Sequence, residues 1–132
     1  MILLDTSVLV PFLRGRATRT TRFLTRVLEE GLDVFLAPIV VQEVLQGARN
    51  DQEWQTLDTY LSSQALIHPQ DAAAAHRQAA RIYFDCRRQG LTVRSTIDCL
   101  IAQLALDHDL AILHEDRDYD AIRRVRPLRT LP

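Results

Sequence analysis

Short, uninterrupted apolar runs alternate with longer amphipathic segments along this chain. Four runs contain no polar position: residues 2–4, 34–36, 65–67 and 110–113. Such runs are typical of strands that are buried on both faces of a parallel sheet. A weaker fifth run spans residues 128–131. The pattern therefore predicts a sheet of four to five strands.

Between these runs, apolar residues recur every three or four positions, as they do in amphipathic helices. We predict helices near residues 23–28, 38–45, 54–61, 72–86 and 95–105. Gly31, Pro38 and Gly90 mark helix ends or starts among them. Strands that alternate with helices are joined by right-handed crossovers. The expected fold class is therefore α/β: one domain over residues 1–132, with a mostly parallel sheet and helices on both faces.

Charge narrows the range of functions. The 132 residues include 16 cationic and 17 anionic side chains, for a net charge of −1, which argues against binding nucleic acid through bulk positive charge. All 16 cations are arginine, whose planar guanidinium suits phosphate, so an RNA site would need a local arginine patch. No leader or membrane span is apparent, and Cys86 and Cys99 are interpreted as reduced core thiols. We expect a cytoplasmic protein with no membrane role.

Four acids stand close to the predicted strand exits. Asp5 and Asp116 follow strands directly, and Glu43 and Asp98 lie on helices that follow them. In parallel α/β sheets, ligands bind beyond the carboxyl ends of the strands. Converging carboxylates suit a hard cation such as Mg²⁺ or Mn²⁺, because the like charges would otherwise repel one another. The positions thus favour a metal-binding acidic site.

Each acid also has an ordinary structural interpretation. Asp5 could cap the helix after it, and Asp98 could complete a loose capping box with Ser95. Glu43 could lie on a solvated helix face, and Asp116 could serve a turn. Other chemistries find less support, because the four histidines lack metal-site spacing and the four glycines build no phosphate loop.

With these residues the chain resembles PIN-domain ribonucleases of the VapC toxin family, from prokaryotic toxin–antitoxin modules. Four segments carry the resemblance: residues 2–7 (ILLDTS), 41–44 (VQEV), 90–102 (GLTVRSTIDCLIA) and 113–120 (LHEDRDYD). It implies that the metal-binding catalytic quartet is Asp5, Glu43, Asp98 and Asp116. Thr6, Ser7 and Asp118 would have supporting roles, and Glu115 or Asp118 could share the role of the fourth acid.

The resemblance implies an endoribonuclease that uses Mg²⁺ or Mn²⁺, cuts a specific tRNA or rRNA to inhibit translation, forms a homodimer and is inhibited by a VapB-type antitoxin. Contacts with RNA or antitoxin are expected from a set of arginines: Arg14, Arg16, Arg19, Arg22, Arg26, Arg94 and Arg117. Two other classes stay open. A metal-dependent phosphohydrolase would turn over a small phosphomonoester, and a catalytically idle module would bind RNA or antitoxin without divalent metal.

Overall fold

A four-stranded parallel sheet organises the chain. The structure, a computed structural model, describes residues 1–131, so Pro132 of the expected domain lies outside the described residues. The strands are β1 (Ile2–Leu4), β2 (Val34–Phe35), β3 (Ala111–Leu113) and β4 (Thr130–Leu131), in the order β2-β1-β3-β4. The two central strands pair in register from Ile2 with Ala111 to Leu4 with Leu113. The predicted α/β class is confirmed.

The strand predicted at residues 65–67 is wrong. This segment makes only an isolated parallel bridge between Leu66 and Leu36, beyond the edge strand β2. The Leu36 amide donates to the Ala65 carbonyl, and the Ile67 amide donates to the Leu36 carbonyl, each at 3.0 Å. Because Leu66 is 40% exposed, the run is not buried on both faces as its composition suggested. The weaker run at 128–131 supplies the fourth strand, β4, so the sheet has four strands, within the expected four to five.

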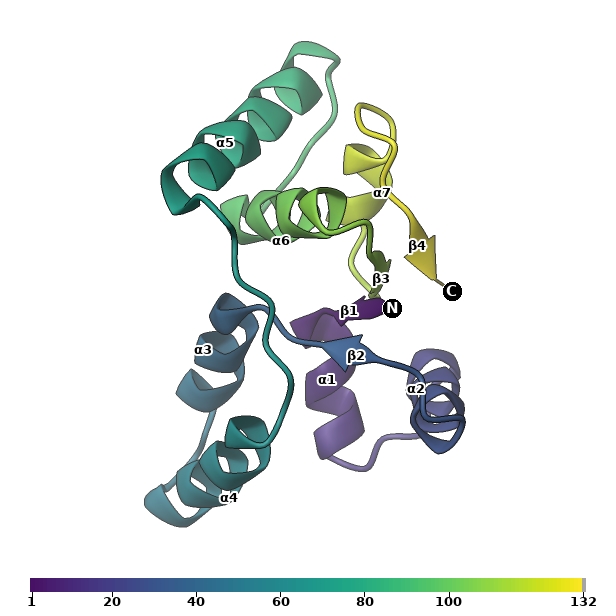
Figure 1. The fold of residues 1–132 in the computed structure, drawn as a ribbon, viewed down its shortest axis with the longest axis vertical. Helices are drawn as coiled ribbons and strands as arrows, with labels where there is room; N and C mark the ends of the chain where they lie inside the picture. The colour runs from purple at the N-terminus through teal and green to yellow at the C-terminus, as the bar shows by residue number, and fades with distance from the viewer. Residues whose placement is uncertain (132) are drawn as a thin grey trace.

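Helices cover both faces of the sheet (Figure 1). One face carries α1 (Thr6–Leu13) and α2 (Arg19–Glu29), and the other carries α6 (Thr96–Asp107) and α7 (Asp118–Ile122). Helix α5 (Ala72–Arg88) packs on α6. Helix α3 (Pro38–Gln46) packs against α1, and α4 (Asp51–Ser62) packs against α3. Right-handed crossovers from a 2-1-3-4 strand order place the helices on these two faces.

Local signals explain most helix ends. Thr18 and Thr21 form a reciprocal capping box that starts α2, and Gly31, at φ +70°, follows its end in a conformation that L side chains rarely adopt. The short helix α7 was not predicted, because its segment reads as a polar turn. Two of its residues, Tyr119 and Ile122, are nevertheless fully buried on one side of this single turn.

The core lies between the central strands and α6. Leu3, Ile112 and Leu113 are fully buried, as is Ile101 of α6. Cys86 and Cys99 are also buried and unpaired, as expected of core thiols. No helix among residues 1–131 is long and apolar enough to cross a membrane. This core fixes the carboxyl ends of β1 and β3 side by side.

Candidate active site

Asp5 stands where the two central strands end. Its backbone amide donates to the Leu113 carbonyl of β3 at 3.1 Å, and its side chain is buried. One carboxylate oxygen, Oδ2, accepts the Ser7 amide at 2.9 Å and the Ser7 hydroxyl at 2.5 Å. The other oxygen, Oδ1, accepts the Tyr119 hydroxyl at 2.6 Å. Asp5 therefore caps α1, as its structural interpretation suggested, and also lies at the strand exits, as the functional interpretation required.

Asp98 enters the same region from the first turn of α6. It is 6% exposed, and its Oδ2 atom is buried without a hydrogen-bond partner. The capping box with Ser95, the alternative interpretation of Asp98, does not form: the Ser95 hydroxyl accepts the Ile97 amide at 3.2 Å, and the Ser95 amide donates to Asp118. Asp98 therefore does not cap α6, and its side chain lies near those of Asp116 and Asp118.

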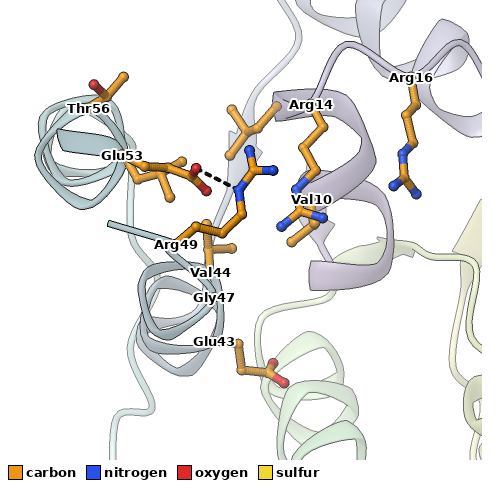
Figure 2. Close-up of a pocket in the computed structure, with 11 residues that line it drawn as sticks. Val10, Arg14, Arg16, Glu43, Val44, Gly47, Arg49, Glu53 and Thr56 are labelled. Atoms are coloured by element: carbon orange, nitrogen blue, oxygen red, sulfur yellow. Dashed lines mark hydrogen bonds and ion pairs between the residues drawn. The ribbon is translucent and has the colours of Figure 1, made fainter. Parts of the chain in front are cut away.

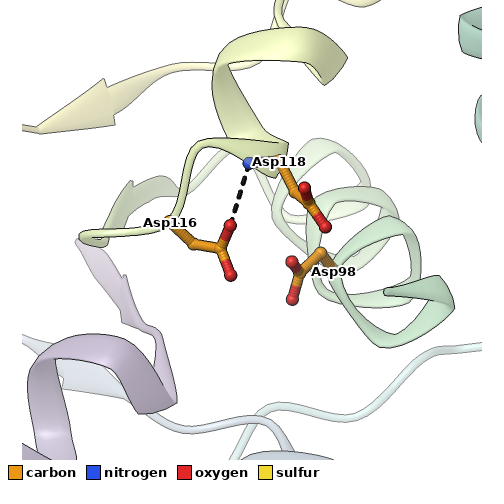
Figure 3. A group of neighbouring side chains, drawn as sticks. All are labelled: Asp98, Asp116 and Asp118. Atoms are coloured by element: carbon orange, nitrogen blue, oxygen red, sulfur yellow. Dashed lines mark hydrogen bonds between the residues drawn. The ribbon is translucent and has the colours of Figure 1, made fainter. Parts of the chain in front are cut away.

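Asp116 and Asp118 complete a cluster with Asp98 (Figure 3). One carboxylate oxygen from each of the three residues lies within 4.8 Å of the other two. Asp116 accepts the Asp118 amide at 2.9 Å, so the loop after β3 holds both carboxylates at a fixed spacing. Asp118 is buried and accepts the amides of Arg94 and Ser95 at 2.8 and 3.0 Å. This residue joins α7 to the start of α6.

Burial and crowding shift the protonation of Asp98. Loss of hydration, followed by the charges of Asp5 and Asp116 and by interactions with Asp118, raises the pKa of Asp98 to about 9. Without a cation, this carboxyl group holds a proton at neutral pH. A divalent cation could replace that proton and provide the missing partner of Oδ2. The donor set, which consists of carboxylate oxygens, fits a hard cation.

Glu43 reaches the site from α3. The Thr6 hydroxyl donates to Glu43 Oε1 at 2.9 Å. Burial raises the pKa of Glu43; the Thr6 hydrogen bond opposes this shift and the charge of Asp5 adds to it. The structure thus links Glu43 to Asp5, although the cluster of three does not include it. The hydroxyls of Thr6 and Ser7 both hold acids of the site in place.

Glu115 and Asp118, the alternatives for the fourth acid, occupy different surroundings. The Glu115 amide donates to the Ser7 hydroxyl at 2.9 Å, but its exposed side chain accepts the Thr20 hydroxyl of α2. Asp118 instead belongs to the acidic cluster. Between the two, the geometry places Asp118 and not Glu115 beside Asp98 and Asp116.

Sequence reasoning missed Tyr119 as a site residue. It is fully buried, donates to Asp5, and packs its ring against His114 with centroids 4.6 Å apart. Burial also lowers the pKa of His114, although neighbouring acids oppose that shift. The available signal was the i, i+3 spacing of Tyr119 and Ile122, which indicates a short helix with one buried side.

The expected arginines fall into three groups. Arg14 and Arg16 line a groove of about 500 Å³ that begins at Glu43 and runs between α1, α3 and α4. Figure 2 shows them opposite Arg49, which forms an ion pair with Glu53 at 2.9 Å. Next to the acidic cluster, the Arg94 guanidinium lies 3.7 Å from Asp118, and Arg117 is exposed at the start of α7. The third group is exposed on α2 and does not line the groove: Arg19, Arg22 and Arg26.

Comparisons with known proteins agree with this architecture. The sequence matches the PIN domain family over residues 2–125. VapC ribonuclease Mb1587 from Mycobacterium bovis is 38% identical over 130 residues, which cover 98% of this chain and 96% of that protein. Ribonuclease VapC11 from Mycobacterium tuberculosis matches with the same identity and coverage.

Solved structures share the fold at lower identity. FitAcB from Neisseria gonorrhoeae superposes with a TM-score of 0.71 at 23% identity, covering all of this chain and 97% of that one. VapBC2 from Rickettsia felis, bound to a DNA fragment from their promoter, gives a TM-score of 0.72 at 18% identity, with 99% and 98% covered. At these identities the likeness establishes the fold.

Proposed function

Because the chain belongs to the PIN domain family, we propose that it is a metal-dependent endoribonuclease and the toxin of a type II toxin–antitoxin module. The full-length relatives named VapC ribonuclease support the reaction class. The observation that carries the proposal in this chain is the buried, unpartnered Oδ2 atom of Asp98 among other carboxylates. Burial of an unpartnered carboxylate oxygen lowers the stability of the fold, and a bound cation would offset that loss.

Mg²⁺ or Mn²⁺ would be held by Asp5, Asp98 and Asp116, with Glu43 and Asp118 completing its surroundings. When bound, the cation supplies Lewis acidity, which activates water and offsets charge on the phosphate. The hydroxyls of Ser7 and Tyr119 orient the Asp5 carboxylate, and Thr6 orients Glu43. Arg94, which lies 3.7 Å from Asp118, and the exposed Arg117 would bind phosphates next to the acids.

We propose that water attacks phosphorus and that the P–O3′ bond breaks. Water would lose a proton to solvent or to a site carboxylate, and the departing O3′ would take up a proton from solvent. One fragment would then end in a 5′-phosphate and the other in a 3′-hydroxyl. Attack by the neighbouring 2′-hydroxyl would leave a cyclic phosphate instead. Mapping of end-labelled products distinguishes the two outcomes.

The partners proposed for this chain are a structured RNA, such as a specific tRNA or rRNA, and a VapB-type antitoxin, with the cytoplasm as the place of action. The VapBC structures that share the fold support an antitoxin partner. The groove beside Glu43 offers Arg14, Arg16 and Arg49 to carboxylates or phosphates that approach the acids. We propose a homodimer as the unit that binds both.

Cleavage of RNA by the purified chain, freed of antitoxin, tests this function. Total and transfer RNA are incubated with protein in Mg²⁺, in Mn²⁺ or in EDTA, beside an Asp5→Asn/Asp98→Asn variant that controls for contaminating ribonuclease. We expect discrete cuts that require both the metal and the intact acids. Equal cutting by the variant, or undiminished cutting in EDTA, would contradict the proposal.

A further inference from the structure

Helix α5 buries one side against α6 and exposes the other. Its buried side consists of small and apolar residues at three- and four-residue spacing: Ala75, Ala79, Ile82 and Cys86. On the opposite side, Arg81, Phe84 and Arg88 follow one another along the helix and are exposed. We call these three residues the α5 outer face. None of them belongs to the acidic site described above.

Phe84 is one of the large apolar side chains that the described residues leave exposed. Its side chain is 37% exposed and, among residues 1–131, it is not part of the core or of the apolar layer around the core. The guanidinium carbons of Arg81 and Arg88 lie 4.8 and 5.6 Å from the centre of its ring. Two cations thus flank an exposed aromatic ring on the surface of the helix.

A polar groove of about 340 Å³ adjoins this face, between the end of α5 and the segment after α7. Arg88, Asp85 and Arg126 are among the residues that line it. Asp85 is paired with Arg126 at 2.9 Å and with Arg81 at 3.0 Å, so its negative charge is already neutralised. Arg88 has no ion-pair partner among the described residues. The groove therefore offers uncompensated positive charge to an anion.

We propose that the α5 outer face and its groove form a second RNA-binding surface, which stacks an unpaired base on Phe84 and binds the flanking phosphates with Arg88 and Arg81. An aromatic ring between guanidinium groups suits an unstacked RNA base and its phosphates, whereas acidic protein segments need no aromatic platform. The inference rests on the proposed ribonuclease function. The segment that follows α5 leads to Arg94, whose guanidinium lies 3.7 Å from Asp118 of the acidic cluster.

Binding of a labelled transfer RNA tests the surface. All proteins carry Asp98→Asn and are measured in EDTA, so that cleavage does not interfere. We expect Phe84→Leu to raise the Kd about five-fold or more. We expect Arg88→Gln to raise the Kd and to lower the slope of log affinity against log salt by about 0.7. Arg129→Gln is a control that also removes one positive charge: Arg129 pairs with Asp109 at 2.9 Å and precedes β4, at the end of the sheet opposite the acids, and its loss should change the Kd less than about two-fold.

The outcomes separate this inference from the proposed function. If the reference protein binds RNA and Phe84→Leu and Arg88→Gln bind it as tightly, the second surface is refuted while the ribonuclease proposal stands. If the protein with its native acids neither binds nor cuts RNA, both fail. Sedimentation of the same variants identifies the remaining alternative, because loss of a dimer would show that the face binds a second copy and would overturn the RNA assignment.

Discussion

At the scale of single residues, three buried side chains determine the hydrogen bonding of the acidic site: Asp5, Tyr119 and Asp98. Asp5 accepts three hydrogen bonds through its two oxygens, Tyr119 supplies one of them, and Asp98 has an oxygen with none. A cluster of this kind is oriented before any ligand arrives, and it is destabilising while it is empty of cations. Substitution of these residues should therefore change both the stability of the metal-free chain and its affinity for metal.

Metal-free stability should fall as pH rises. Burial and neighbouring acids raise the pKa of Asp98 from an ordinary value of 3.8 to about 9. The folded chain then keeps a proton on Asp98 that the unfolded chain loses. The folding stability that this proton provides is complete below pH 3.8 and is lost as pH rises toward 9.

Thermal melting in EDTA between pH 5 and pH 9 measures this effect. The Tm of the parent should fall relative to that of Asp98→Asn, which has no such proton, and saturating Mn²⁺ should reduce the difference. A constant Tm difference between the two proteins across this range would contradict the raised pKa of Asp98.

Tyr119→Phe should weaken metal binding without unfolding the chain. The ring keeps its buried packing, whereas Asp5 loses the 2.6 Å hydrogen bond that orients one of its oxygens. Loss of such an orienting partner lowers metal affinity by about ten-fold or more. Calorimetric titration with Mn²⁺ measures the change, and Tyr60→Phe on α4 is the matched control. Equal affinity in the two variants would show that Tyr119 has only a packing role.

At the scale of elements, the periodicity of the sequence predicts the long helices and the central strands, but not the short pieces that complete the site. Helices α4, α5 and α6 follow their apolar spacing closely. The edge run at 65–67 and the single turn α7 are decided by tertiary contacts that no local pattern encodes. The acids at the strand exits could be predicted because their place follows from topology. Tyr119 could not, since its role depends on a contact 114 residues away along the chain.

Asp118→Ala should detach the start of α6 from α7. The buried carboxylate accepts the amides of Arg94 and Ser95, and both would lose their partner. We expect the free energy of unfolding to fall by roughly 2 kcal/mol. Asp120→Ala, an exposed acid on the same helix, should change it by less than about 0.5 kcal/mol. Urea denaturation measures the free energy of unfolding of both variants. Equal values would show that Asp118 does not hold the start of α6 to α7.

At the scale of the whole molecule, the net charge is close to zero, but acidic and basic side chains lie in different places. Acids gather at the carboxyl ends of the sheet, and arginines line the groove beside Glu43, the surroundings of α7 and the outer side of α5. This distribution would allow an anionic RNA to approach the arginines if a cation offset the charge of the acids. Net charge alone would not have revealed it, because −1 is the sum of opposing local charges.

The proposed homodimer is tested at the same scale. Sedimentation velocity of the chain without antitoxin should give a mass near twice the 15.1 kDa of one copy. A single species at the mass of one copy, over the concentrations used for cleavage, would rule the homodimer out. The acidic site of one copy would then have to account for cleavage alone.

The acids at the strand exits are proposed to bind the divalent cation that RNA cleavage requires. Calorimetric titration of Mn²⁺ into the metal-free chain, with Asp98→Asn measured beside it, shows whether they do. We predict saturable binding to the parent and a loss of about 100-fold or more in affinity in the variant, because a ligand is removed and not a group that orients one. Equal binding by both proteins, or no binding by a parent that still cuts RNA, would contradict the account.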